Sequence, residues 1–169
     1  MLFKRALIAA FTMAVAGCAL VDGTFATGPT FKPTENISPN EAVVYIYRDA
    51  SWAIRSRAAR FYINDVHLFS LDQLGYSWVS LPAGHYTLRQ GWPIDMMAKS
   101  IQLELDVKPG QVRYFSFRTG VCPKQEPHSL CMDYRLQEQP ASIAQPEIAD
   151  KRFQENFGLA DLRQTLSSK

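Results

Sequence analysis

Residues 101–118 read IQLELDVKPGQVRYFSFR and contain the clearest fold signal in the chain. Apolar and polar side chains alternate from Ile101 to Val107, which predicts a β-strand with one buried face. Pro109 and Gly110 favour a turn, because proline presets φ and glycine accepts the left-handed position. Val112–Arg118 is again rich in β-branched and aromatic residues. The segment therefore predicts two strands joined as an antiparallel hairpin.

Further strand-like segments lie on both sides of this hairpin. Ala42–Arg48 is apolar on both faces, which predicts a central strand. Asn64 and Asp65 join two short segments and tolerate the positive φ of a tight hairpin turn. The expected strands are 42–48, 60–63, 66–70, 76–81, 85–90, 101–107, 112–118 and 132–136. Their length and spacing predict an all-β fold, a single antiparallel β-sandwich of the immunoglobulin-like or PEGA-like kind.

The C-terminal part of the chain has a different pattern. Ala149, Phe153 and Phe157 are spaced four residues apart, which predicts one apolar stripe on a helix over residues 147–157. We therefore expect residues 139–169 to form a linker and a short C-terminal helix.

The first 18 residues have the pattern of a secretion signal. Lys4 and Arg5 precede an apolar run over residues 6–16, which is shorter than the roughly 20 residues needed to span a bilayer. Val15-Ala-Gly-Cys18 resembles the lipobox of bacterial lipoproteins, in which the cysteine receives a diacylglycerol. We expect residues 1–17 to be a signal peptide and Cys18 to be the lipid anchor. An incidental cysteine or an uncleaved short anchor is the alternative.

The residues after the anchor predict where and how the domain is held. Ala19 stands where lipoproteins kept in the inner membrane carry aspartate, so we expect anchoring in the bacterial outer membrane, on its periplasmic face. Residues 18–40 are rich in Gly, Pro, Thr and Asn and are expected to be a flexible tether to a β-sandwich domain over residues 41–138.

The charge balance bears on the kind of partner. The formal net charge of +2 falls to zero when Lys4 and Arg5 are removed with the signal peptide. A neutral domain without a clustered basic face gives no reason to expect nucleic acid as a partner.

The two remaining cysteines, Cys122 and Cys131, are expected to form a disulfide, because disulfides persist outside the cytoplasm. The alternative is a metal site that adds His128. Zinc needs a fourth ligand or an open catalytic position, and nothing nearby supplies one convincingly. We therefore expect no metal and no cofactor.

An arginine-rich segment follows the first strand. Arg48, Arg55, Arg57 and Arg60 surround Trp52. Guanidinium groups bind phosphate and carboxylate in a bidentate way, so these arginines are candidates for binding an anionic lipid or glycan. A solvated loop without a ligand is the alternative.

Two other groups of side chains were considered for binding or catalysis. Tyr76, Trp78, Tyr86 and Trp92 could form an aromatic platform for a glycan or peptide, or could pack within the sheets. His85 in a Pro-Ala-Gly-His turn is the best candidate general base, although exposed turn residues of this kind are commonly inert. No nucleophile elbow, metalloprotease helix or phosphate loop is present in the sequence, so we expect no enzyme.

Three segments together resemble a family of bacterial lipoproteins, the domain of unknown function 2846. They are AVVYIYR at 42–48, FYINDVHL at 61–68 and GYSWVSLPAGHYTL at 75–88. The resemblance implies a small β-rich envelope domain and no established activity. We expect a lipid-anchored, non-catalytic module that binds an envelope protein or supports an assembly, with anionic lipid or glycan binding through residues 48–60 as the alternative.

Overall fold

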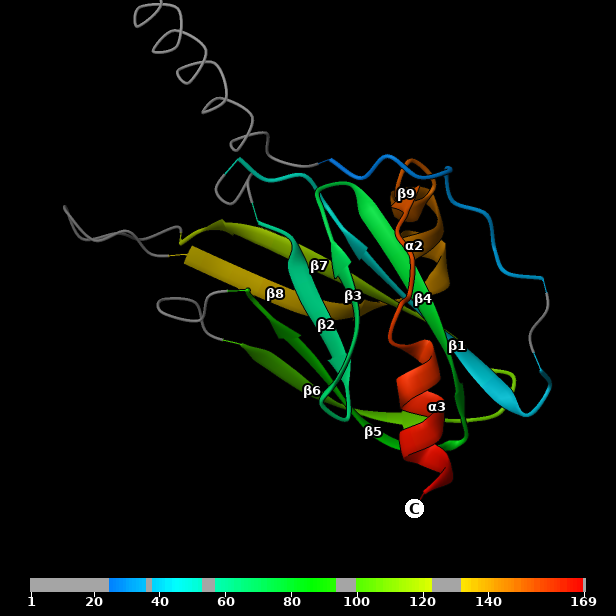
Figure 1. Cartoon of the computed structure of the whole chain (residues 1–169). Coiled ribbons are helices and arrows are strands. Elements are labelled where there is room, and N and C mark those ends of the chain that lie inside the picture. The colour runs from blue at the N-terminus through cyan, green and yellow to red at the C-terminus, as the bar shows by residue number, and fades with distance from the viewer. Residues whose placement is uncertain (1–24, 36–37, 53–56, 94–99, 123–131, 169) are drawn as a thin grey trace, which may run out of the picture.

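Two β-sheets pack face to face, with short helices against them (Figure 1). The structure is a computed structural model, and it describes residues 25–35, 38–52, 57–93, 100–122 and 132–168. The predicted β-sandwich is confirmed.

The larger sheet has five strands in the order β8-β7-β1-β4-β9. Their bounds are Glu41–Arg48 (β1), Gly75–Pro82 (β4), Val112–Val121 (β7), Met132–Gln139 (β8) and Arg152–Phe153 (β9). β1 is the central strand, as predicted, and is buried on both faces. The pairs β1–β7 and β4–β9 are parallel, whereas β1–β4 and β7–β8 are antiparallel. This sheet is therefore mixed.

The smaller sheet has four strands in the order β3-β2-β5-β6, all antiparallel. Their bounds are Ala59–Ile63 (β2), Val66–Leu71 (β3), Gly84–Gly91 (β5) and Ile101–Val107 (β6). The predicted turn between β2 and β3 is confirmed, since Asn64 and Asp65 have φ of 46° and 66°.

Apolar side chains form two cores, one on each face of the larger sheet. The main core lies between the sheets and includes Phe61, Phe69 and Phe117. The second core lies on the outer face, where alternate β1 residues pack beneath helix α2 (Ala141–Ile148). The larger sheet is therefore covered on both sides, which explains why its central strand is apolar on both faces from Ala42 to Tyr47.

The predicted hairpin between residues 101–107 and 112–118 is wrong. Both strands exist, but β6 pairs with β5 in the smaller sheet, whereas β7 pairs with β1 and β8 in the larger one. The turn itself forms, with Gly110 at φ 70° and a bond from Gln111 N to Lys108 O. Gly110 N then donates to Glu41 O, and Val43 N donates to Gln111 O. These hydrogen bonds hold the turn beside β1, so the chain passes from the smaller sheet to the larger one.

The predicted helix over residues 147–157 is also wrong. Helix α2 ends at Ile148, β9 occupies Arg152–Phe153, and helix α3 runs over Leu159–Ser167. The Phe153 backbone N–H donates to Pro29 O at 2.8 Å, and its ring packs on Tyr76. These contacts replace the helical bonds that the spacing of apolar residues predicted. The short C-terminal helix exists, but it is α3.

Residues 25–35, expected to belong to a flexible tether, lie against the sandwich instead. The Phe31 ring packs on the edges of Tyr45 and Tyr76, with centroids 5.4 and 5.1 Å away. Phe31 N also donates to Lys151 O. The composition of this segment predicted a tether, but its aromatic side chain packs into the second core and holds the segment against the sandwich. Cys18 and the predicted signal peptide lie outside the described residues.

The predicted disulfide stays a prediction, because Cys131 lies outside the described residues. β7 and β8 pair as far as Val121 and Met132.

Candidate functional site

The edges of the two sheets lie next to each other along two long sides of the sandwich. These two sides are covered to different extents. On the β3–β4 side, α3 packs against β3 and inserts Leu162 into the main core. On the β6–β8 side, a groove of about 580 Å³ separates the two edge strands. Its lining residues are Leu103, Glu104, Arg113, Phe115, Leu136, Gln137, Glu138 and Gln139. This groove, the β6–β8 groove, is the candidate functional site.

The lining of the β6–β8 groove combines apolar side chains with polar ones. Phe115 and Leu136 belong to the main core and are almost fully buried, and Leu103 packs against them. Glu104, Gln137 and Glu138 are exposed. Such a lining is typical of sites that bury apolar side chains of a ligand and orient it with a few polar contacts.

Arg113 ties the two edges of the groove together. Its Nε and Nη2 each donate to Glu138 on β8 at 2.6 Å, a bidentate pair, and its Nη1 donates to Asp106 O on β6 at 2.8 Å. The guanidinium also lies over Phe115, 5.3 Å from the ring centroid. Arg113 thus sets the spacing of β6 and β8. The sequence analysis missed it, although an arginine within a strand of aromatic residues is a signal for a paired or stacked guanidinium.

Both strands that border the groove are edge strands. Among the described strands, β6 pairs only with β5, and β8 pairs only with β7. An edge strand presents main-chain N–H and C=O groups that can pair with another extended chain. Charged side chains on these strands, such as Glu104 and Arg135, discourage unspecific sheet-to-sheet pairing.

Arg48, one of the four arginines predicted to bind an anion, is not on the surface. Its side chain is fully buried, and its Nη1 donates to Arg57 O at 2.7 Å and Leu71 O at 2.8 Å. Burial lowers the pKa of Arg48 to about 10, so it stays charged at neutral pH. Arg57 is exposed and Arg60 is half-buried in β2, whereas Arg55 lies outside the described residues. Arg48 therefore does not reach a surface ligand, and the anion site stays a prediction for the other three arginines.

The four aromatic residues considered as a platform are divided between the cores. Tyr86 and Trp92 are buried in the main core, and Tyr76 is buried in the second core. Trp78 is partly buried and lines a separate groove of about 530 Å³ beside Phe153 and Leu159. Their packing role is what the structure supports.

The His67 ring lies beside a hydroxyl group. Its Nε2 lies 3.3 Å from Ser70 Oγ, and its ring packs against Tyr62 and Phe157. Burial lowers the pKa of His67, and the nearby Arg60 lowers it further. Because the surroundings oppose protonation of the ring, this contact does not favour a general base.

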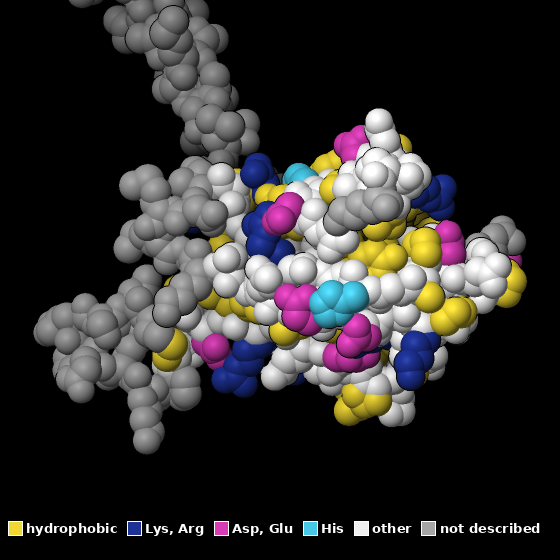
Figure 2. Space-filling view, turned by 90° about the horizontal axis from the view of Figure 1, so that it is seen from below, with side chains coloured by type: hydrophobic (Ala, Val, Ile, Leu, Met, Phe, Trp, Pro, Cys, Tyr) yellow, Lys and Arg dark blue, Asp and Glu magenta, His cyan; other side chains and the backbone are white. Residues whose placement is uncertain are grey.

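His85 lies on the surface at the start of β5, between two carboxylates of β6. Its Nδ1 is 2.7 Å from Asp106 and its Nε2 is 3.1 Å from Glu104. The view from below shows acidic side chains beside a histidine on this face (Figure 2). The hydrogen bond with Asp106 raises the pKa of His85 above its usual 6.5. The ring is thus a solvated partner of an acidic pair.

We expect an NMR titration to give a pKa above 6.5 for His85, and Asp106→Asn to lower it towards that value. Glu104→Gln should lower it less, because the Asp106 hydrogen bond is the largest cause. The raised folded-state pKa stabilises the fold below pH 6.5, and this contribution is lost as the pH rises through the folded-state pKa. A pKa of His85 that is unchanged in Asp106→Asn would contradict this geometry.

Within the described ranges, no helix is both long and apolar enough to cross a bilayer. Among the same residues, no three His, Cys, Asp or Glu side chains are placed to hold a metal ion.

Comparison with known proteins identifies the family of this chain. A family model described as "Protein of unknown function (DUF2846)" matches residues 38–127, just over half of the chain. The match begins shortly before β1 and extends beyond β7, and it confirms the resemblance seen in the sequence. No curated protein matches the chain.

Proposed function

Because the chain belongs to DUF2846, a family whose description names no activity, we propose a function from its own residues: it is a lipid-anchored, non-catalytic module of the bacterial envelope. It binds an extended segment of another envelope protein along the β6–β8 groove. The alternating side chains of that segment would enter the groove while its backbone pairs with an edge strand, the mode called β-strand addition.

The observation that carries this proposal is the groove between two edge strands. The β3–β4 side of the sandwich is closed by α3, whereas the β6–β8 side leaves Leu103 partly exposed above the core. Arg113 fixes the width of the groove through bonds to both strands. A preformed site of this kind lowers the ordering cost of binding.

The proposed location rests on the sequence. The charged, apolar and small residues before Cys18 stand in the order that lipoprotein processing requires. The sandwich suits this location, since its N-terminal segment runs along the surface and can lead to an anchor.

The alternative is that the segment 48–60 binds anionic lipid or glycan. Arg48 cannot take part in such binding, because its side chain is buried in the interior. Arg57 is exposed and could still contact an anionic group.

Photo-crosslinking in native cells tests the protein-binding proposal. A crosslinking amino acid replaces Gln137, which lines the groove, or Gln164, which is exposed on α3. We expect position 137 to give adducts with an envelope protein at least about tenfold more abundantly than position 164, a ratio equivalent to about 1.4 kcal/mol. The two sites share the same native side chain, so they differ mainly in location.

Two results would contradict the proposal. Equal yields from positions 137 and 164 would show that the groove is not a preferred contact. An adduct of position 137 with a second copy of this chain alone would show self-association through the edge strands instead.

A further inference from the structure

Four segments of the chain converge on the connection between β3 and β4, residues 71–74. Ala26 N donates to Gln73 O at 2.9 Å, and Ser51 N donates to Gln73 Oε1 at 2.7 Å. Arg152 N donates to Leu74 O at 2.8 Å. Arg48 joins Leu71 O to the backbone of residue 57. Gln73 itself is buried, so these segments are held at one end of the molecule.

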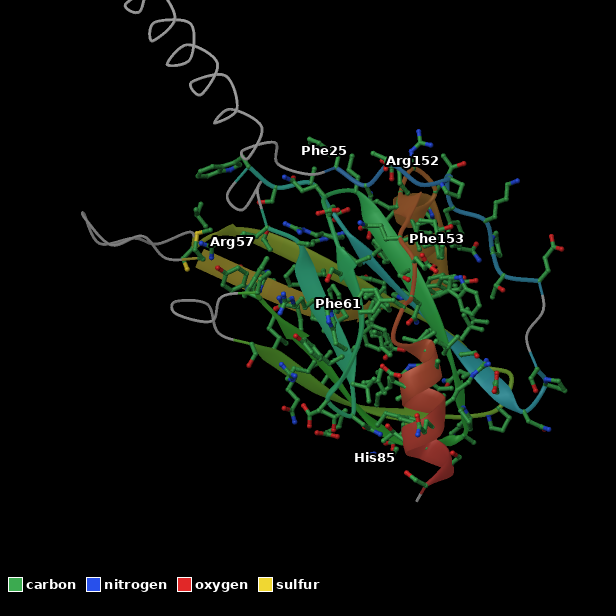
Figure 3. All side chains as sticks on the ribbon, viewed as in Figure 1. Phe25, Arg57, Phe61, His85, Arg152 and Phe153 are labelled. Carbon is green, nitrogen blue, oxygen red and sulfur yellow. The ribbon has the colours of Figure 1, made fainter. Side chains whose placement is uncertain are left out.

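Each of these segments places an exposed aromatic or basic side chain at that end. Phe25 is 48% exposed and Trp52 is 71% exposed, whereas most large apolar side chains of the described residues are buried. Arg57 and Arg152 are exposed as well. Figure 3 shows Phe25 and Arg152 at the top of the molecule and Arg57 below them at its left edge, with His85 at the bottom. We call Phe25, Trp52, Arg57 and Arg152 the anchor-side surface.

The length of chain before Phe25 limits how far this surface lies from the proposed anchor. Phe25 follows Cys18 by seven residues. A fully extended chain covers about 3.3–3.6 Å per residue, so Phe25 lies within about 25 Å of the acylated residue. The described part of the chain thus begins close to the bilayer, at the end where the aromatic and basic residues gather.

We propose that the anchor-side surface rests on the phospholipid bilayer, with Trp52 and Phe25 at the level of the headgroups and Arg57 and Arg152 on lipid phosphates. Tryptophan is favoured at this depth because its ring is largely apolar and its N–H is polar. Arginine is attracted to anionic headgroups and forms bidentate bonds with phosphate. This inference rests on the proposed lipid anchor and adds an orientation to it.

The orientation follows from the arrangement of the two ends. The acidic pair around His85 lies on the opposite side of the molecule, and anionic headgroups would repel it. The charges of the two ends therefore favour one orientation of the domain, with the anchor-side surface towards the membrane.

Tryptophan quenching in vesicles tests this orientation. The full-length lipidated protein is placed in vesicles of phosphatidylcholine and phosphatidylglycerol with brominated acyl chains, and the Trp52 signal is the difference from Trp52→Phe. We expect bromination to reduce that signal by roughly twofold or more, because interfacial side chains reach the headgroup–acyl boundary. The matched control carries Trp52→Phe and Gln164→Trp, and the tryptophan on α3 should not be quenched.

The test separates this inference from the proposed function. Acylation of Cys18, read by mass spectrometry on the same sample, tests the anchor alone. Acylated protein with an unquenched Trp52 would overturn the orientation and leave the anchor in place. Quenching that is equal for Trp52 and for the tryptophan on α3 would also overturn it, because the domain would then have no preferred face.

Discussion

Replacing Arg48 with alanine should lower the free energy of unfolding by about 3–5 kcal/mol, because the substitution removes both a large buried side chain and a hydrogen-bond donor. Truncating a large, fully buried side chain costs about 2–5 kcal/mol. It also leaves Leu71 O and Arg57 O without their donor, at about 1–3 kcal/mol for the buried Leu71 carbonyl and less for the partly buried Arg57 carbonyl. The lost desolvation cost of the guanidinium offsets part of this loss.

Two further substitutions identify the cause of the loss. Arg48→Met fills most of the space without a donor, so it should cost about 2 kcal/mol, less than alanine. Arg57→Met is the matched control, because the Arg57 side chain is exposed and only its carbonyl is used. It should change stability by less than about 0.5 kcal/mol.

Urea unfolding with a constant m-value is the measurement. If Arg48→Ala and Arg57→Met shift the midpoint equally, Arg48 is not the link between the sheets that its contacts indicate. Arg48 ends β1 in the larger sheet, whereas its acceptor Leu71 ends β3 in the smaller sheet and its acceptor Arg57 lies two residues before β2.

The strands could be predicted from the sequence because their signals are local. The apolar run of β1 indicated a strand covered on both faces, and the structure gives it a sheet on one side and α2 on the other. The pair Asn64-Asp65 indicated a turn through its tolerance of positive φ, and both residues adopt it.

The pairing of the strands could not be predicted, because alternation shows which face is buried but not which strand lies alongside. β6 and β7 are joined by a real turn and still belong to different sheets. Helix-like spacing at residues 149, 153 and 157 misled for a similar reason. Phe153 is only partly buried and lies on a strand, and Phe157 is 58% exposed.

The candidate site could be predicted only in its general nature, as an edge open to strand addition. The groove depends on β6 and β8 lying opposite each other, which follows from the strand order of both sheets. Arg48 is the opposite case, because its local sequence already indicated where it lies. It follows six buried residues of β1 directly, so its burial could have been read from the strand, but its charge suggested the surface.

The two proposed surfaces are compatible in one membrane-bound protein. The β6–β8 groove lies along a side of the sandwich, away from the segments that gather at residues 71–74. A domain resting on its anchor-side surface would leave this groove facing the periplasm. A partner could then bind without lifting the domain from the bilayer.

Replacing Cys18 with alanine should move the protein from the membrane fraction to the soluble fraction. One acyl chain gives an association constant with membranes of about 10⁴ M⁻¹, and each buried CH₂ contributes about 0.8 kcal/mol. Lipoproteins carry at least two such chains on the cysteine, so membrane partitioning should fall by about 10⁴-fold or more. The aromatic and basic residues of the anchor-side surface are too few to replace that contribution.

The measurement is fractionation of native cells followed by mass spectrometry of the purified protein. We expect the unsubstituted protein in the outer membrane, with an acylated Cys18 at its N-terminus. Reduction should add two hydrogen atoms to its mass if Cys122 and Cys131 are paired. Cys122→Ala is the matched control and should stay in the membrane, even though losing the predicted disulfide costs about 2–3 kcal/mol of stability. A Cys18→Ala protein that remains in the membrane, or an unsubstituted protein that still begins at Met1, would show that another feature of the chain holds it there.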